Sequence, residues 1–407
     1  MRRLRVLLLS LPMLLAGCGG GGDAGAEPLA TEWPILLSHP WSNTADSSFH
    51  GDERVGRDSF DPYGVKRALE AGGAVVYQPS KLAYASHEVR GRLLYRKCAG
   101  GTVAQALCDS GEAELIDGVE WATLDYCALP ERRARHGFSS EPECQRGLRF
   151  NIICHSQGCP DSRYMMVAVT NRLSGEPMYR HVASWTSLAG ANKGTALADW
   201  ILGLTAACLL PGCRSPLLDV ALLADSLRQD GTLVPNATES IVALSRKYML
   251  DTIDMNCDPT RRDDCAPSFN ELYPLPEDPT HPILYQSFSF RIDDIEHPCY
   301  RGLRLYYDVV AREEGANDAY ISVESQQFAT YGRDGSGGRT PVIVREINGV
   351  SLDPAQAHPG LDHMAPSNSM AVGIEGVQCA NEDNSAFRFS RVGLYRDVVA
   401  ELVRWGY

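Results

Sequence analysis

The residue of this 407-residue chain best placed to do chemistry is Ser156, in the pentapeptide Cys-His-Ser-Gln-Gly. Segment 148–153 before it is apolar and predicts a buried strand, and the segment from Cys159 predicts a helix with Pro160 in its first turn. A sharp turn between a strand and a helix lifts a serine out of the sheet and directs the helix N-terminus at developing negative charge. This arrangement is typical of the nucleophile in acyl transfer.

Acyl transfer also needs a base, an orienting acid and oxyanion donors. Where the nucleophile follows a strand, the chain order is serine, then an acid, then histidine, so the acid and base are expected in strand-end loops after Ser156. Most such turns have glycine two residues before the serine, but this chain has Cys154 there and keeps only Gly158. A plain surface turn is the alternative interpretation of the pentapeptide.

Strands that alternate with helices must position this turn. The predicted strands are 33–38, 74–77, 148–153, 181–189, 283–288 and 303–307, and the predicted helices include 64–70, a helix from 159 and 391–405. This order predicts an α/β fold whose mostly parallel sheet is covered by helices on both faces. Residues 98–146 hold four cysteines and predict an irregular insertion, and 332–354 predict a polar loop or hairpin.

The pattern changes between about residues 196 and 262. Segments 196–210 and 217–227 are apolar at helical spacing, which predicts either a helical cap over the site or ordinary core helices. We expect one domain over residues 31–407 that carries this region as its cap insertion.

The N-terminus predicts export. Three arginines among the first five residues precede an apolar run that is too short to span a membrane. The segment ending at Cys18 resembles a bacterial lipobox, so residues 1–18 are expected to be a lipoprotein signal and 19–30 a flexible tether. Lipid chains on Cys18 would hold the protein at a membrane surface, and Gly19 favours the outer membrane. An ordinary signal peptide, with secretion, is the alternative.

The bulk composition excludes one class of partner. A net charge of −13 without a basic stripe argues against nucleic acid. Besides Cys18 the chain has twelve further cysteines, and an even number in an exported protein predicts disulfides. No pair of C-x-x-C motifs supports a zinc site.

Sequence does not assign the disulfide pairs. Close pairs that form small loops are Cys98/Cys108, Cys208/Cys213 and Cys257/Cys265. Cys154 and Cys159 lie on either side of Ser156, and a bridge between them would stiffen the turn. Two free thiols, or bridges to other cysteines, are the alternatives for this last pair.

Ten short segments, in order along the chain, resemble segments of known enzymes: 33–39, 71–77, 88–93, 155–158, 162–164, 182–195, 269–274, 284–288, 317–322 and 361–364. The sequence they resemble is that of the bacterial triacylglycerol lipases of the Pseudomonas and Burkholderia type. The resemblance implies an α/β-hydrolase fold with a helical cap or lid, a Ser-Asp-His triad and hydrolysis of lipid or other carboxylic esters. It also raises a dedicated lipase foldase as a partner.

Carried over residue by residue, the resemblance makes Ser156 the nucleophile, Asp318 the acid and His363 the base. Asp318 precedes an apolar run, and its alternative is a turn aspartate. His363 lies in a loop bounded by prolines, where His358 is the alternative base. His155, next to the serine, is expected to be buried against the sheet.

The oxyanion donors are expected to be two backbone N–H groups. One belongs to Gln157, and the other comes from the loop after the first strand. The resembling lipases have His-Gly there, but this chain has His39-Pro40, and proline has no N–H. Trp41 is therefore the expected donor; a wall of an acyl pocket or a core tryptophan is its alternative role.

The resembling lipases also hold a structural calcium through aspartates, one of them two residues after the base. This chain has Ala365 at that position, so a like-for-like site is not expected. Asp293 and Asp294 are acidic candidates, or simply a surface turn. No other cofactor is predicted.

Related chemistry leaves further alternatives. A polyester depolymerase or a thioesterase uses the same triad, and motifs do not separate them. From a different class, a catalytically inactive α/β-hydrolase that acts as a surface-binding lipoprotein would explain the departures at Cys154, Pro40 and Ala365.

Overall fold

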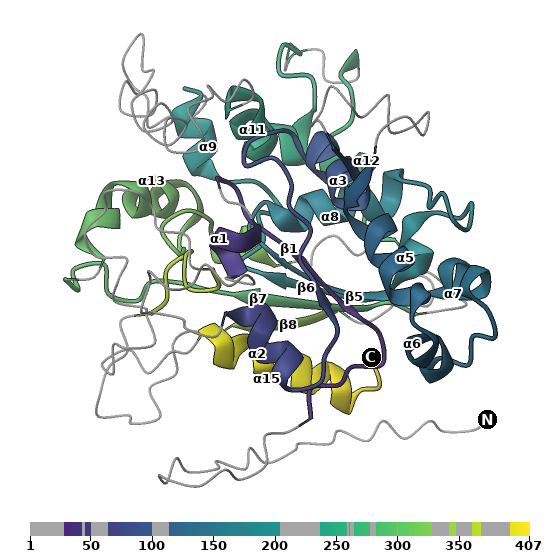
Figure 1. Ribbon diagram of the computed structural model, residues 1–407. Helices are drawn as coiled ribbons and strands as arrows, with labels where there is room; N and C mark the ends of the chain where they lie inside the picture. Colours follow the sequence, from purple (N-terminus) through teal and green to yellow (C-terminus); the bar gives the residue numbers. More distant parts are fainter. Residues whose placement is uncertain are drawn as a thin grey trace, which may run out of the picture.

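A six-stranded sheet forms the centre of the protein (Figure 1). The structure, a computed structural model, describes residues 28–42, 45–49, 64–99, 114–203, 237–258, 260, 264–276, 282–298, 300–327, 342–346, 360–367 and 391–407. The strands of the sheet are β2 (Val76–Tyr77), β1 (Ile35–Ser38), β5 (Phe150–His155), β6 (Val182–Leu188), β7 (Leu284–Ser289) and β8 (Val342–Glu346), in that spatial order. All neighbouring pairs are parallel, as the sequence predicts.

The register aligns the carboxyl ends of the central strands. Ser38 at the end of β1 lies opposite Cys154, and His155 at the end of β5 lies opposite Leu188 of β6. The segments that follow these three strands therefore leave the sheet at the same edge. In parallel sheets this edge is where ligands bind.

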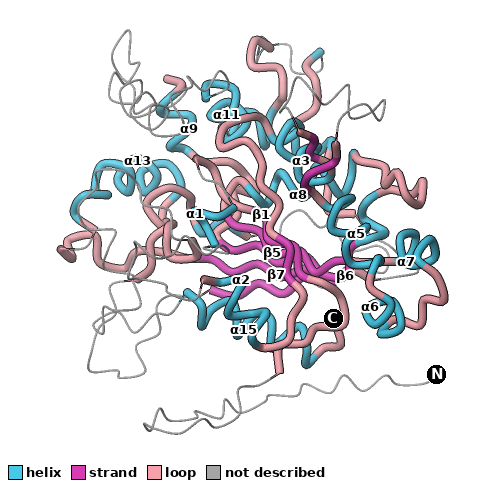
Figure 2. The backbone as a smooth tube through the Cα atoms, in the orientation of Figure 1, coloured by secondary structure: helices cyan, strands magenta, loops and turns pink. Residues whose placement is uncertain are grey.

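Helices cover both faces of the sheet (Figures 1 and 2). One face carries α2 (Val65–Ala71) and α15 (Arg391–Arg404), and the other carries α3 (His87–Tyr95), α5 (Val119–Ala128) and α8 (Gly158–Ala168).

Alternate strand residues pack toward the two helical layers. Ile35 and Leu37 belong to the hydrophobic core with α2 and α15, while Leu36 and Ile152 belong to the core with α5 and α8. Because both faces are covered, every residue of β1, β5, β6 and β7 is buried.

The remaining elements surround this core. They are α1 (Ala45–Phe49), the antiparallel pair β3 (Lys97–Cys98) and β4 (Leu115–Asp117), α6 (Pro130–Arg135), α7 (Glu141–Gly147), η3 (Met178–His181), α9 (Ala196–Ile201), α11 (Ala237–Leu244), η4 (Lys247–Asp251), α12 (Phe269–Leu272), η6 (Arg301–Leu303), α13 (Arg304–Glu314) and α14 (Val323–Gln326). Figure 1 shows α9, α11 and α13 beyond the carboxyl ends of the strands. No helix in the described ranges is long and apolar enough to cross a membrane.

Three predicted elements differ from the structure. The strand expected at 303–307 is the start of α13: its apolar residues alternate locally, but Tyr306, Val309 and Val310 form a helical face that packs near Leu197. The insertion expected at 98–146 is helical from residue 119 onward. The hairpin expected at 332–354 contains β8, an edge strand of the main sheet.

Other expectations fall wholly or partly outside the described residues. These are the signal and tether up to residue 27, the second predicted cap helix, Cys108, the Cys208/Cys213 pair and His358. Between residues 196 and 262, α9 lies at the start of the first predicted helix, 196–210, and α11 was not predicted.

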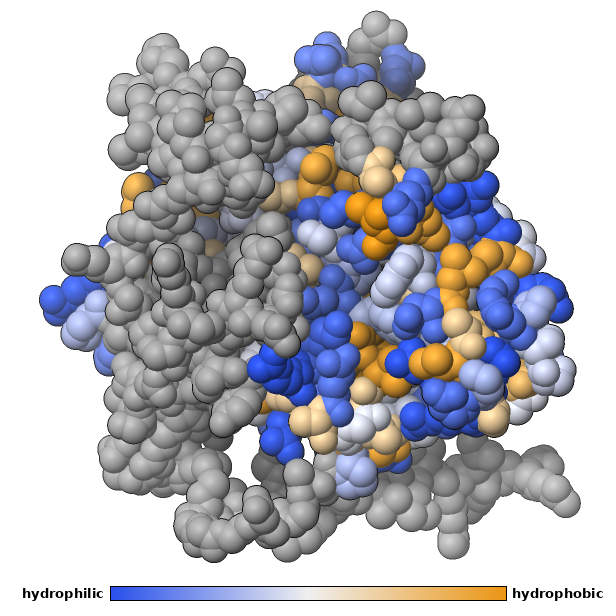
Figure 3. Space-filling model, in the orientation of Figure 1, coloured by the Kyte–Doolittle hydropathy of each residue, from blue (hydrophilic) through white to orange (hydrophobic). Residues whose placement is uncertain are grey.

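The described surface mixes hydrophilic and hydrophobic side chains on the face shown in Figure 3. Large apolar side chains that are at least a third exposed come from separate elements: Ile116, Trp121, Leu129, Leu250, Leu272, Leu305 and Trp405. Single exposed apolar residues of this kind are ordinary.

Gly91 allows α3 and α8 to approach closely beside the site. A Cβ there would lie 2.6 Å from the Asp161 carbonyl oxygen and 2.7 Å from the Tyr164 ring. We expect Gly91→Ala to lower the free energy of unfolding by about 1–3 kcal/mol, because the helices must separate. Urea denaturation measures it, with exposed Arg67→Ala as the control, expected within about 0.5 kcal/mol of wild type. Equal midpoints for the two variants would contradict this role of Gly91.

Candidate active site

Ser156 occupies the sharp turn that joins β5 to α8. Its φ of 54° lies in the left-handed region that residues other than glycine seldom adopt. Its N–H donates to the Leu188 carbonyl at 3.2 Å, and its carbonyl accepts from Cys159 and Ala191 at 3.1 and 3.2 Å. The predicted strand, turn and helix are therefore all present around the serine.

Three distant segments bring Ser156, His363 and Asp318 together. His363 Nε2 lies 2.7 Å from Ser156 Oγ, and His363 Nδ1 lies 2.7 Å from Asp318 Oδ2. A carboxylate only accepts hydrogen bonds, so Nδ1 carries the proton and Nε2 is left to accept from the serine hydroxyl. Ser156 and His363 are each 5% exposed and Asp318 is fully buried.

The Asp318 carboxylate is held on both oxygens. Oδ1 accepts from the backbone N–H groups of Tyr320 and Ile321 at 3.0 and 2.8 Å. Oδ2, which faces His363, also accepts from Gln326 Nε2 at 3.1 Å. Sequence reasoning missed Gln326, because no motif marks a residue whose role is to hold another side chain.

Two aromatic rings lie against the His363 imidazole. The His155 ring lies 5.0 Å from it and the Tyr320 ring 5.6 Å, measured between centroids. His155 is fully buried, as expected, and its Nε2 lies 2.9 Å from the His363 carbonyl oxygen. Burial, with the neighbouring His363 imidazole, holds the pKa of His155 well below its usual value, so a neutral His155 donates to that carbonyl.

The direction of each expected oxyanion donor N–H is set by the hydrogen bonds that the carbonyl of the same peptide group accepts. The Arg90 guanidinium donates to the Pro40 carbonyl at 2.9 Å. In a trans peptide the carbonyl and the following N–H are antiparallel, so the Trp41 N–H points away from Arg90. In the same way, the bonds to the Ser156 carbonyl set the direction of the Gln157 N–H.

Beneath this turn lies a buried ion cluster that the sequence did not reveal, made of Asp161, Lys81, Arg90 and His87. Asp161, in the first turn of α8, lies 3.0 Å from Lys81 Nζ, 2.6 Å from Arg90 Nε and 3.1 Å from His87 Nδ1. All four side chains are fully buried. Burial alone would raise the pKa of Asp161, but Arg90, Lys81 and His87 outweigh it and lower that pKa to about 2.

Helix α11 contacts the same region. Ser240 Oγ lies 3.3 Å from Gln157 Oε1, and His87 Nε2 lies 2.8 Å from the Ala243 carbonyl oxygen. The described part of the predicted cap therefore adjoins the turn rather than a remote part of the core.

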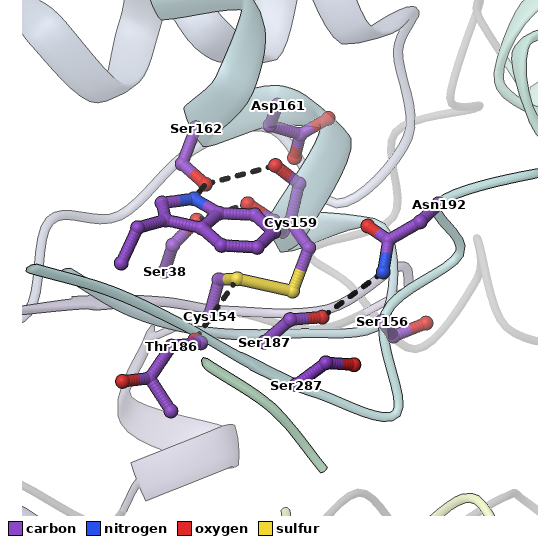
Figure 4. The surroundings of a disulfide bond; sticks show 12 residues. Ser38, Cys154, Ser156, Cys159, Asp161, Ser162, Thr186, Ser187, Asn192 and Ser287 are labelled. Atoms are coloured by element: carbon purple, nitrogen blue, oxygen red, sulfur yellow. Dashed lines mark hydrogen bonds between the residues drawn. A yellow bond between two sulfur atoms is a disulfide. The ribbon is translucent and has the colours of Figure 1, made fainter. Parts of the chain in front are cut away.

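A disulfide joins Cys154 to Cys159 across the turn, which decides between the alternatives for this pair (Figure 4). The two Cα atoms lie 4.9 Å apart. Both cysteines lie in the core between the sheet and α8, while Figure 4 shows the Ser156 hydroxyl directed away from them. The cysteine at the usual glycine position is thus accommodated because its side chain points into the core.

Two other disulfides join cysteines that both lie in the described ranges. Cys257–Cys265 is the predicted small loop, and Cys127–Cys144, which links α5 to α7, was not predicted. Cys98 is also disulfide-bonded, and its expected partner lies outside the described residues.

The calcium site implied by the resemblance does not fit the described residues. Ala365 packs in the hydrophobic core, Asp293 pairs with Arg291 at 2.7 Å, and Asp294 accepts from the Glu296 N–H. No group of three His, Cys, Asp or Glu side chains suited to a metal occurs in the part of the chain that the structure describes.

The parallel sheet, the two helical layers and the serine at the strand–turn–helix define an α/β-hydrolase fold, as predicted. No protein-family model matches the chain. It is 25% identical to a triacylglycerol lipase of Pseudomonas fragi over 232 residues, which are 54% of this chain and 59% of that lipase. The resemblance to bacterial triacylglycerol lipases is thereby confirmed.

Solved structures were compared as well. A metagenomic carboxyl esterase matches with a TM-score of 0.48 and 14% identity, over 95% of this chain and 81% of the esterase. The lipase of Staphylococcus hyicus matches with a TM-score of 0.48 and 13% identity, over 92% of this chain and 96% of the lipase.

The lowered pKa of Asp161 predicts an acid-dependent contribution to stability. A depressed carboxylate pKa stabilises the fold above the unfolded value near 4, and this contribution is lost as pH falls toward about 2. We expect Asp161→Asn to be less stable than wild type at pH 6 by about 2 kcal/mol or more. Denaturant titrations should show that the difference in free energy of unfolding between wild type and Asp161→Asn becomes smaller between about pH 4 and pH 2. A difference that stays constant over this range would contradict a lowered pKa of Asp161.

Proposed function

We propose that this protein is a serine hydrolase that cleaves carboxylic esters through an acyl-serine intermediate. The observation that carries the proposal is the relay from Ser156 Oγ to His363 Nε2 and from His363 Nδ1 to Asp318 Oδ2, with 2.7 Å at both steps. Its support is the strained turn at Ser156, which isolates the hydroxyl beside the imidazole.

In the first step, His363 Nε2 accepts the Ser156 proton as Oγ attacks the ester carbonyl. Asp318 keeps the proton of His363 on Nδ1 and stabilises the imidazolium that forms. Since Asp318 accepts from two backbone N–H groups and from Gln326, its carboxylate is fixed before the reaction starts.

The tetrahedral oxyanion is bound by the backbone N–H groups of Trp41 and Gln157, which Arg90 and the contacts of the Ser156 carbonyl orient. The start of α8 adds the positive end of a helix dipole. His363 then returns its proton to the leaving alcohol, and an acyl-serine remains.

In the second step, His363 accepts a proton from water, which attacks the acyl carbon. The same donors bind the second oxyanion. Ser156 leaves with the proton from His363, and the carboxylic acid is released.

The proposed substrates are lipid or other carboxylic esters. The relative named triacylglycerol lipase supports this class. Polyesters and thioesters undergo the same chemistry, so the substrate profile must be measured with each.

We propose an exported protein held at a membrane surface by lipid on Cys18, with secretion as the alternative. Disulfides Cys127–Cys144, Cys154–Cys159 and Cys257–Cys265 support folding in an oxidising compartment. A lipase foldase as folding partner belongs to the same proposal.

The triad is tested with a fluorophosphonate probe and p-nitrophenyl esters of short to long acyl chains. We expect labelling of wild type and none of Ser156→Ala, with turnover lower by about 10⁴-fold or more. His363→Ala should fall comparably, since the hydroxyl loses its base. A wild-type protein that neither labels nor hydrolyses any ester, although folded, would favour the inactive surface-binding lipoprotein.

Gln326→Met tests whether the amide that holds Asp318 matters for turnover. Methionine keeps the length of the side chain but removes the donor to Oδ2, and we expect kcat to fall roughly 10-fold with KM little changed. Ser287→Ala is the control, because the Ser287 hydroxyl contacts only the backbone carbonyl of Gln326, at 2.6 Å. Wild-type kcat in Gln326→Met would show that Asp318 is held without it.

A further inference from the structure

Lys81 is a fully buried lysine whose ammonium has all of its partners in or beside the site. Its Nζ lies 3.0 Å from Asp161 Oδ2, 2.7 Å from Ser38 Oγ and 3.1 Å from the His39 carbonyl oxygen. An ammonium has three N–H donors, so each is used. Lysine is rarely fully buried, because removing its charge from water is costly.

The three contacts connect two parts of the proposed site that are far apart in the chain. Ser38 and His39 belong to the end of β1 and the segment that leads to Trp41, named here the β1 loop (residues 39–42). Asp161 belongs to α8, which starts directly after the Ser156 turn. Lys81 therefore bridges the segment that carries one expected oxyanion donor to the helix beside the other.

A second hydrogen-bonded connection, from Lys81 to α8, runs through Ser38. Its hydroxyl accepts from Lys81 and donates to the Gly158 carbonyl at 2.8 Å. A Cβ at Gly158 would lie 2.3 Å from the Ser38 carbonyl oxygen, so the backbones of β1 and α8 are in direct contact here. If the end of β1 and the β1 loop moved away from α8, Lys81 would lose either its contacts with Ser38 and His39 or its bond to Asp161.

The lysine also holds the β1 loop through its backbone. The Lys81 N–H donates to His39 Nε2 at 2.9 Å, while the Arg90 guanidinium donates to the carbonyls of His39 and Pro40. Asp161 accepts from both cations at once. The Asp161 carboxylate thus fixes the Lys81 and Arg90 side chains, which both bond to the β1 loop.

We propose that Lys81, anchored by Asp161, is a positioning residue that sets the distance between the two oxyanion donors, Trp41 on the β1 loop and Gln157 at the turn. The proposal rests on the proposed hydrolase function. Lys81 itself touches no reacting atom, so its effect must pass through the loop.

The charge of Lys81 depends on the cluster around it. Burial lowers the pKa of Lys81 from its usual value, Asp161 opposes this shift, and Arg90 adds to it. The charged or titratable groups that face its ammonium and backbone are Asp161 on α8, Arg90 on α3 and His39 on the β1 loop. Without the carboxylate, a dehydrated ammonium would be strongly disfavoured.

Lys81→Met separates positioning from stability. It removes one of the two cations that bond to Asp161 Oδ2 while Arg90 remains, so we expect a folded protein with a urea midpoint below that of wild type. We expect kcat on p-nitrophenyl esters to fall roughly 10- to 100-fold with KM within about threefold, because misplaced donors weaken transition-state binding more than substrate binding. The Ki of a boronic acid that forms a tetrahedral adduct should rise in proportion to the loss in kcat/KM.

Lys193→Met is the matched control. Lys193 is also buried and paired with a carboxylate, Glu324 at 3.2 Å, but it lies in the segment that follows β6. We expect its kcat and boronate Ki to match wild type. An equal loss of kcat in both lysine variants would overturn the specific role of Lys81.

Ser38→Ala keeps the test decisive if Lys81→Met does not fold. This variant cuts only the relay from the ammonium to the Gly158 carbonyl, and we expect a severalfold fall in kcat with a parallel rise in boronate Ki. Wild-type values in Ser38→Ala, or in a folded Lys81→Met, overturn the proposal. The fluorophosphonate probe distinguishes failure of the Lys81 proposal from failure of the hydrolase proposal. If wild type does not label, the hydrolase proposal is the one that fails.

Discussion

The left-handed backbone at Ser156 is the constraint on which the rest of the site depends. A serine with φ of 54° is strained, and such a residue persists only where its surroundings over-determine it. Here the bonds of its N–H and carbonyl to the ends of neighbouring segments hold the turn, and the Cys154–Cys159 disulfide closes it from below. The strain leaves the hydroxyl exposed to the imidazole instead of buried in the sheet.

Two polar networks flank this turn, and they act on different partners. Gln326 and two backbone N–H groups hold Asp318, which in turn holds His363. The ion cluster around Asp161 grips the β1 loop from the opposite side through Lys81 and Arg90. A buried polar group without a partner is costly, so each network is most stable when all of its donors and acceptors are paired. This pairing fixes the positions of the side chains. The proposed catalytic groups lie where the two networks meet.

The departures from the resembling lipases take on physical meaning in this structure. Cys154 replaces a glycine, and its side chain enters the core as half of a disulfide. Pro40 lacks an N–H, and its carbonyl accepts from Arg90, which orients the next peptide. Ala365 packs in the hydrophobic core. The departures at Cys154 and Pro40 therefore do not require that the site be inactive.

The amino-acid sequence was enough to predict the parallel sheet and the turn at Ser156, because strand and helix periods and the strand–turn–helix pattern are local in the chain. The choice of Asp318 and His363 as acid and base rested on the resemblance to bacterial lipases. The sequence pattern misjudged 303–307, where the local alternation of apolar residues hid the helical face of α13, which only packing against α9 reveals. Tertiary structure alone decided the pairing of Asp161 with Lys81, 80 positions away, and of Gln326 with Asp318. Such contacts leave no periodic trace in the sequence, since a buried charge is recognised by its partner in space and not by its neighbours in the chain.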